Sequence, residues 1–252
     1  MDIELSNRKV VAVDGGTATG KGRLIEELAI LLRSKGVPVV HVSTGSIYRA
    51  VAYAALEAAA DMVVGRADMT PEQINHAALA LVREMSADEF LKLARQRQIE
   101  LHGGVVWIDG VPAEVDEQLK GPGVGTGASI AGLHLPVREW ETELVRRQIN
   151  EFDGFVLIDG RDIGHTVVPD APLKLLLVVA PEVAAQRSRE HTLEEIVERD
   201  ERDRTREHGA LRHPGDPGEG VVVLATDKHT PESLRDEVYE LMCGVFADLP
   251  AA

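Results

Sequence analysis

The residues whose types and spacing could do chemistry begin near the N-terminus, with Gly15, four intervening residues, Gly20 and Lys21. This spacing matches the start of a P-loop, in which glycines let the backbone curl so that successive N–H groups point at a phosphate. The lysine reaches the outer phosphates of a nucleotide. The next position, which usually supplies a Mg²⁺-binding hydroxyl, is Gly22. We therefore expect a nucleotide-phosphate site formed by Gly15, Gly16, Thr17, Ala18, Thr19, Gly20, Lys21, Gly22 and Arg23.

Arginine side chains provide the second chemical signal, concentrated in residues 199–206. This stretch holds four arginines and three carboxylates. On a helix, Arg199, Asp203 and Arg206 would share one face. A charged run alone is typical of a solvated helix with internal ion pairs. Because this run follows a P-loop in the same chain, we favour a helix that closes a phosphate site.

Two further arginines are candidates for phosphate contacts. Arg161 directly follows an apolar stretch and stands in a turn beside Asp162. A guanidinium binds phosphate oxygens in pairs, so Arg161 is a candidate clamp, and a turn with local ion pairs is the alternative. Arg49 follows Gly45 in a helix-forming stretch, where a plain surface arginine is the alternative.

Composition bounds the class of protein. The chain has 252 residues and a formal net charge of −15 at pH 7. These values suit one large α/β domain, or one with an insertion, and argue against nucleic-acid and anionic-membrane partners. The single cysteine, Cys243, fits a reducing cytosol, and neither a signal peptide nor a membrane span is predicted. We therefore expect a cytoplasmic monomer that binds small anions in a locally basic pocket and uses no side-chain metal site.

Short apolar strands alternate with helical stretches along most of the chain. We expect strands at 9–14, 37–43, 154–159, 173–179 and 221–225. This alternation predicts a three-layer α/β fold with a five-stranded parallel sheet covered on both faces. Ligands in such folds bind at the carboxyl ends of strands, where Asp14, Thr44 and Asp159 lie.

The segment after the second strand breaks this rhythm. Within 61–98 we expect two polar-faced helices, and within 99–115 a β-hairpin that turns at Asp109-Gly110. Glycines crowd residues 121–132, which we interpret as a mobile loop. The other expected helices are 21–35, 47–60, 136–151, 181–189, 193–206 and one that opens at Thr230. The predicted organisation is a P-loop core at 1–60 and 151–252, a lid near 187–206, and an insertion at 61–150.

Several separate blocks resemble the bacterial-type cytidylate kinases, which phosphorylate CMP and dCMP from ATP. The blocks are Gly20-Lys21-Gly22, Thr44 to Arg49, Ala128-Ser129, Pro136 to Glu139, Asp159 to Gly164 with Pro169-Asp170-Ala171, and Glu198 to Arg206. Each block is short, but their order and spacing along residues 9–241 are typical of this family.

The resemblance implies a role for individual residues. Lys21 would bridge the donor and acceptor phosphates, and Arg187 would lie near the ATP base. The acceptor phosphate would be clamped by Arg49, Arg161 and Arg206. The remaining substrate contacts would be Thr44, Arg199 and Asp203 at the sugar, Ser129, Arg138 and Asp162 at cytosine, and Asp159 nearby. The implied cofactors are ATP and Mg²⁺, with Mg²⁺ held mainly by phosphates and water.

The chain departs from the family pattern in its P-loop and its lid. Gly16 stands where proline is usual, and Arg23 stands where threonine is usual. The lid between Arg187 and Ile196 is shorter than in common members. Two other functions therefore stay open: a P-loop kinase of another nucleoside monophosphate or small metabolite, and a non-catalytic nucleotide-binding regulator.

Overall fold

The structure is a computed structural model that describes residues 8–64, 69–113, 118–188 and 192–250. Its chain forms two compact units, one of Met1–Val42 with Ile149–Ala252 and one of Ser43–Gln148. The predicted functional division, with an insertion at 61–150, stays a prediction. Residues 189–191 of the predicted lid and 114–115 of the predicted hairpin lie outside the described residues.

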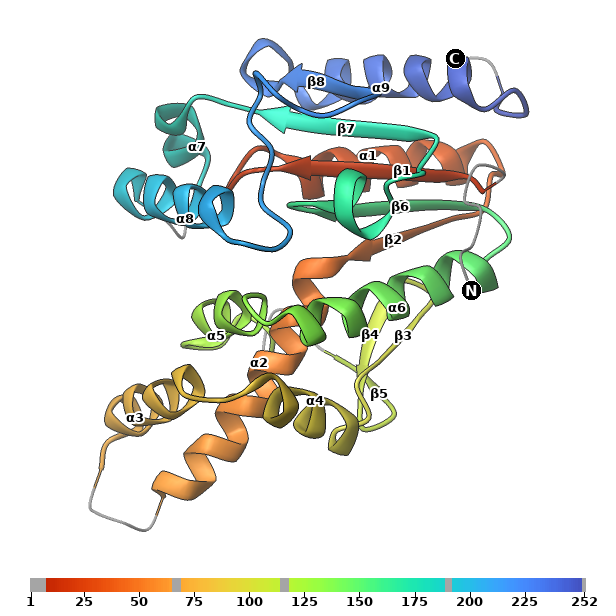
Figure 1. Ribbon diagram of the computed structural model, residues 1–252. Coiled ribbons are helices and arrows are strands. Elements are labelled where there is room, and N and C mark those ends of the chain that lie inside the picture. Colours follow the sequence, from red (N-terminus) through yellow and green to blue (C-terminus); the bar gives the residue numbers. More distant parts are fainter. Residues whose placement is uncertain (1–7, 65–68, 114–117, 189–191, 251–252) are drawn as a thin grey trace. The chain divides into compact units, whose positions relative to one another are not determined.

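A five-stranded sheet forms the centre of the first unit and confirms the predicted fold class (Figure 1). Its strand order is β2-β6-β1-β7-β8. The strands are β1 (Val10–Gly15), β2 (Val39–Ser43), β6 (Phe155–Gly160), β7 (Leu173–Val178) and β8 (Val221–Ala225). Parallel registers on both sides of β1, with Val10 opposite Val156 and Val11 opposite Leu173, place its carboxyl end in the middle of the sheet edge.

The core explains why the β1 sequence forms a central strand. All six residues of β1 are buried, as expected for a β-branched run covered on both faces. Val11 and Val13 pack with Leu24 and Leu28 of α1 and with Val238 of α9 in one apolar cluster. The sheet therefore holds the loop after β1 on a rigid support.

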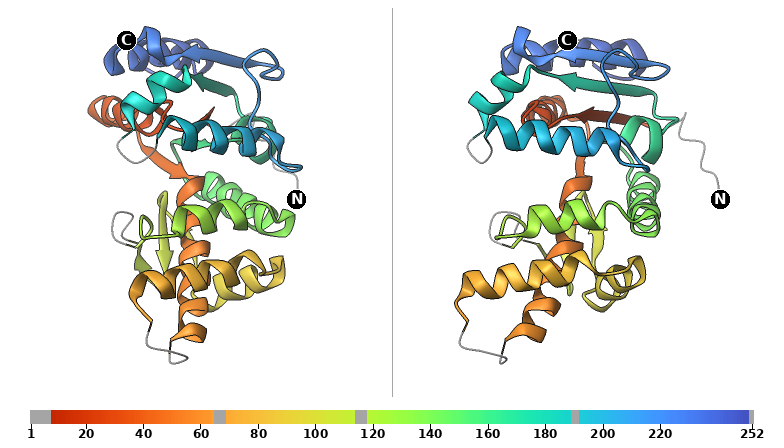
Figure 2. Two further views of the ribbon diagram at one scale, coloured as in Figure 1. Left: turned by 90° about the vertical axis from the view of Figure 1, so that its left-hand side faces the viewer. Right: turned by 60° about the vertical axis from the view of Figure 1, so that its left-hand side comes forward.

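Helices of the first unit occupy two places. Helices α1 (Lys21–Ser34) and α9 (Pro231–Val245) contribute to the apolar cluster against the sheet. Helices α7 (Pro181–Arg187) and α8 (Leu193–Thr205) lie at the carboxyl end of the strands (Figures 1 and 2). Single turns at Ile163–Val167 (π-helical) and Thr226–Lys228 (3₁₀) follow β6 and β8. The charged helix α8 is thus placed at the edge where the P-loop lies.

The second unit is built around one long helix. It consists of α2 (Thr44–Val63), α3 (Pro71–Arg83), α4 (Ala87–Gln96), α5 (Val124–Ala131) and most of α6 (Leu135–Glu151), with a small sheet. Figure 2 shows α3 and α5 lying across α2. Helix α2 begins at Thr44, earlier than the predicted residue 47, with Ser43 as its N-cap residue.

The glycine-rich stretch 121–132 is a helix for most of its length, so the predicted mobile loop is wrong. Helix α5 starts after Gly123, whose φ of +79° suits glycine. Gly127 faces α2, where an added Cβ would lie 3.0 Å from the Ala52 Cβ. The glycines therefore let two helices approach closely, which overrides their low helix propensity.

The predicted hairpin is a three-stranded antiparallel sheet. Its strands are β3 (Glu100–His102), β4 (Val105–Ile108) and β5 (Val111–Pro112). The predicted turn at Asp109-Gly110 is confirmed, and both residues have positive φ, as a type I′ turn requires. A second turn at Gly103-Gly104, which we did not predict, adds the extra strand. Among the described residues, no helix is long and apolar enough to cross a membrane.

Candidate functional site

The loop between β1 and α1 has the curled backbone that the P-loop spacing predicts. Gly20 adopts φ +92° just before α1 and serves as its N-cap residue. Ala18 adopts φ +53°, a conformation that is uncommon for residues other than glycine and typical of functional loops. Inside the loop, the buried Thr19 hydroxyl donates to the Gly16 carbonyl over 3.1 Å. The sequence therefore folds locally into a phosphate-loop shape.

Lys21 folds back over this loop. Its Nζ donates to the carbonyl oxygens of Gly15 and Gly16, each at 2.7 Å. Burial and the Arg161 charge together lower the pKa of Lys21 to about 7, although the carboxylates of Asp159, Asp200 and Asp14 oppose the shift. The ammonium is thus held at the loop by uncharged acceptors, which an anion can replace.

Asp14 ties the P-loop strand to the turn that follows β6. Its two carboxylate oxygens accept the backbone N–H groups of Ile163 and Gly164 at 2.7 and 2.8 Å. Burial raises the pKa of Asp14 to about 7, although these two N–H bonds act against the rise. Because Arg161 and Asp162 immediately precede the turn, Asp14 fixes the position of both relative to the loop.

Arg161 connects the P-loop to α8. Its Nη1 donates to the Gly15 carbonyl at 3.2 Å, and its Nη2 donates to the Thr17 hydroxyl at 2.9 Å. The same guanidinium pairs with Asp200 at 3.1 Å and with Asp203 at 3.2 Å. Its side chain is only 16% exposed. Arg161 therefore lies at the P-loop, as a phosphate clamp must.

The carboxyl end of α8 brings further predicted residues together. The Arg206 Nη1 lies 3.6 Å from Asp203 Oδ1, and the Arg206 Nη2 lies 3.4 Å from Asp162 Oδ1. Helix α8 ends at Thr205, so Arg206 is its extended C-cap residue. Arg199 is partly buried on the same helix. Of the predicted acceptor residues in the first unit, Arg161, Asp162, Asp203 and Arg206 thus form one connected set.

Three other predicted residues of the first unit have partners outside this connected set. Asp159 pairs with His41 at 2.8 Å. Arg187 donates to the hydroxyl and the carbonyl of Thr226, both at 2.9 Å. Arg23 makes ion pairs with Glu26 and Glu27 of its own helix, and its side chain is 58% exposed.

Four predicted acceptor-site residues belong to the second unit. Thr44 is buried at the start of α2, and Arg49 and Ser129 are partly buried on α2 and α5. Arg138 on α6 is 4% exposed. Its Nη1 donates to the Gly132 carbonyl at 3.2 Å, and its guanidinium lies 5.9 Å from the centre of the Tyr48 ring.

Comparison with known proteins adds an independent observation to this geometry. The profile of the family described as "Cytidylate kinase" matches residues 11–243. The chain belongs to the cytidylate kinase family. It is 32% identical over 239 residues to the "Probable cytidylate kinase" of Vairimorpha ceranae, a match that covers 92% of this chain and 95% of the relative. The "Cytidylate kinase" of Cupriavidus necator is 30% identical over 251 residues, covering 95% and 97%. That of Bacillus cereus (strain G9842) is 29% identical over 260 residues, covering 96% and 100%.

The loop of this cytidylate kinase family member fits a nucleotide phosphate. The Thr17 N–H and hydroxyl both donate to a carboxylate oxygen of Asp200, each at 2.8 Å. A carboxylate oxygen is an anionic acceptor like a phosphate oxygen, so the loop already holds a stand-in of the right charge. For Mg²⁺, Gly22 supplies no hydroxyl at the position where a P-loop usually has one.

Sequence analysis missed the residues that support the site. Asp14 was placed among the strand ends that face the ligand, but its contacts with Ile163 and Gly164, 149 and 150 positions further along the chain, were not predicted. Asp200 lies in the charged run, outside the predicted face of Arg199, Asp203 and Arg206. A buried carboxylate just before a P-loop glycine is the signal that could have revealed Asp14. For Asp200 the sequence carries no such signal.

Proposed function

We propose that this cytidylate kinase family member transfers a phosphoryl group from MgATP to CMP or dCMP. One observation carries the proposal: Lys21 and Arg161 both donate to the Gly15 carbonyl, at 2.7 and 3.2 Å. Two cations that converge on one oxygen of a P-loop are arranged to share an incoming phosphate. Phosphoryl transfer needs little covalent chemistry from the protein, because positioning and charge stabilisation do most of the work.

In this proposal each predicted residue keeps a stated role. The loop Gly15–Gly22 and Arg23 hold the donor with Arg187 near its base, and Lys21 bridges the two phosphates. The acceptor phosphate is clamped by Arg49, Arg161 and Arg206. The sugar and base contacts are Thr44, Arg199, Asp203, Ser129, Arg138, Asp159 and Asp162. When bound, ATP supplies the phosphoryl group and Mg²⁺ neutralises charge on its phosphates. The chain acts on free nucleotides as a monomer in the cytoplasm, with no nucleic-acid or membrane partner.

Base selection follows from hydrogen-bond chemistry. Cytosine presents an amino donor beside two acceptors, whereas uracil presents an acceptor beside an N–H donor. An ionised carboxylate only accepts and a guanidinium only donates. Asp162 facing the amino group and Arg138 facing the acceptors therefore match cytosine and reject uracil. A mispaired group in a buried site costs roughly 1–3 kcal/mol.

The test is a coupled ADP-release assay with a panel of nucleoside monophosphates. We expect CMP and dCMP to exceed UMP by about 10²-fold or more in kcat/KM. Asp162→Asn, whose amide donates as well as accepts, should narrow this ratio mainly by weakening CMP. The exposed Asp170→Asn, on the same segment, is the matched control and should leave the ratio unchanged.

Three results would count against the proposal. Equal use of CMP and UMP by the wild-type protein would favour a kinase of another monophosphate. Absence of ADP release with every acceptor would favour a non-catalytic nucleotide-binding regulator. Full discrimination retained by Asp162→Asn would remove Asp162 from the base site.

A further inference from the structure

A carboxylate of α8 occupies the rim of the P-loop. The Asp200 Oδ1 accepts the Thr17 N–H and the Thr17 hydroxyl, each at 2.8 Å. It also accepts from the Arg161 Nη1 at 3.1 Å. One oxygen therefore accepts hydrogen bonds from a P-loop N–H, a P-loop hydroxyl and the guanidinium of Arg161, the candidate phosphate clamp. The side chain that carries it is 14% exposed.

These donors are the kind that a P-loop presents to phosphate. Backbone N–H groups at such a loop are aimed at an anion, and guanidinium prefers oxyanions. A helix carboxylate that needed only an ion pair could have met Arg161 alone. Instead it reaches the loop backbone, so Asp200 satisfies the groups that a nucleotide phosphate would satisfy.

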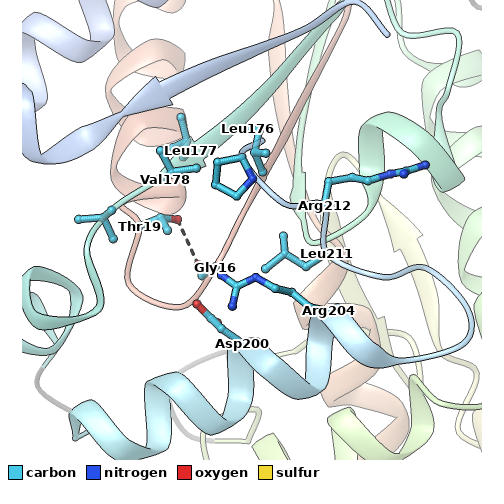
Figure 3. A pocket seen from close by; sticks show the side chains of 11 residues that line it. Gly16, Thr19, Leu176, Leu177, Val178, Asp200, Arg204, Leu211 and Arg212 are labelled. Carbon is cyan, nitrogen blue, oxygen red and sulfur yellow. Dashed lines mark hydrogen bonds between the residues drawn. The ribbon is translucent and has the colours of Figure 1, made fainter. Parts of the chain in front are cut away.

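A small cavity lies beside the contact. Gly16, Thr19 and Asp200 line a cavity of about 60 Å³ together with Arg204 and residues of β7 (Figure 3). Sites for small molecules typically enclose roughly 300–1,000 Å³. Figure 3 shows the Asp200 carboxylate directed at Gly16. At about 60 Å³ this cavity beside the contact is smaller than a nucleotide site.

Gly16 makes the contact possible. A Cβ built on Gly16 would overlap the Asp200 Oδ2 and come close to its Cγ. Gly16 is not among the residues with positive φ, so its backbone conformation does not demand glycine. Instead, the Asp200 carboxylate occupies the space that a side chain at position 16 would fill. The position is the one where the family pattern usually has proline.

We propose that Asp200 is an internal competitor of the donor nucleotide. Its carboxylate takes the place of a phosphate at the P-loop and must leave before ATP binds. The inference rests on the proposed function only in taking ATP as the ligand of the loop. Because Asp200 also pairs with Arg161, its departure removes one of the two carboxylates that hold this arginine, and Asp203 remains. Donor affinity is therefore set partly by α8.

The experiment measures binding without an acceptor. Dissociation constants for ATP and for inorganic tripolyphosphate are determined by calorimetry on the full chain at fixed ionic strength. Asp200→Asn removes the charge and keeps the size of the side chain. Loss of charge-assisted bonds of this kind should tighten both ligands by roughly 10- to 100-fold. The control is Glu201→Gln, the exposed neighbour on α8, which loses the same charge without touching the loop.

A second variant changes the P-loop residue that faces Asp200. Gly16→Ala keeps the Asp200 residue, but its Cβ would occupy the position of the Asp200 carboxylate. It should therefore also tighten the binding of tripolyphosphate, and it serves as a test even if Asp200→Asn folds poorly. Thermal melting with and without ATP separates this role from that of a merely structural ion pair, whose loss would lower the melting temperature in both states. Without ligand, Asp200→Asn should melt below the wild-type protein. With saturating ATP, the two proteins should melt together, because ATP has displaced Asp200 in both.

Two results would overturn the inference. Weaker binding of both ligands by Asp200→Asn would make Asp200 a positioning residue of the loaded site. Affinities equal to those of Glu201→Gln would mean that the contact does not compete with phosphate. Neither result depends on CDP formation, so a failure of the proposed function would be recognised separately by the acceptor assay.

Discussion

The protonation state of Lys21 should control how ATP binds as a function of pH. In the free protein, burial and the neighbouring Arg161 lower the pKa of Lys21 to about 7. Only the ammonium form can bridge two phosphates. In the complex with ATP, the phosphate charges favour that form and raise the pKa again. The free protein and the complex should therefore respond differently to alkaline pH.

The size of the effect follows from the pKa. With a pKa of about 7, roughly half of the free protein carries the ammonium at pH 7, about one-eleventh at pH 8 and about one-hundredth at pH 9. Since kcat/KM reports the free enzyme, its value for ATP should fall about fivefold from pH 7 to 8 and about tenfold from pH 8 to 9. At saturating ATP, kcat should stay nearly level over this range.

The assay follows CDP formation at several ATP concentrations from pH 7 to 9.5, above the last phosphate ionisation near pH 6. Lys21→Arg is the matched variant, because its guanidinium stays charged throughout. It should be slower but show a level profile. A wild-type kcat/KM that is level up to pH 9 would refute the reasoning about Lys21. A fall that persists in Lys21→Arg would assign the titration to another group.

Two further predictions concern stability. Between pH 4 and 7 the folded protein holds a proton on Asp14 that the unfolded chain has lost, because burial raises the pKa of Asp14 from 3.8 to about 7. The contribution of Asp14 to the free energy of unfolding should fall as the pH rises, by about 2 kcal/mol from pH 5 to 7. Asp14→Asn should remove this pH dependence when the free energy of unfolding is measured in urea. An equal pH dependence in both proteins would contradict the prediction. Gly127→Val should overpack α5 against Ala52 of α2 and lower stability by about 1–3 kcal/mol. Gly125→Val, where an added Cβ meets nothing within 4 Å, should change thermal melting much less.

The sequence predicts well those features that depend on short-range pattern. The valines before Gly15 are sufficient to predict a strand buried on both faces, and β1 is that strand. Thr70 followed by Pro71 predicts a helix start, and the structure shows a capping box there with Gln73. Asp109-Gly110 predicts a tight turn for the same local reason. Each of these needs only neighbouring residues.

Features that depend on a distant partner were missed. The glycines in 121–132 by themselves predict a loop. Only the packing of Gly127 against α2 explains why this stretch forms a helix. The contact between Thr17 and Asp200 joins residues 183 positions apart. Its existence depends on where α8 lies at the end of the sheet, which no local periodicity encodes. The base-site assignments of Asp162 and Arg138 stay predictions.

The register of β1 has a consequence for how the chain is made. Residues 10–15 pair with residues 156–160 of β6 and 173–177 of β7. At roughly 5–20 residues per second, a ribosome needs on the order of 7–30 s to supply the intervening chain. During that interval the segment Ser43–Gln148 emerges complete, whereas Val10, Val11 and Val13, which end fully buried, have no sheet to join. A ribosome stalled before residue 155 would therefore display an apolar strand without either of its neighbouring strands.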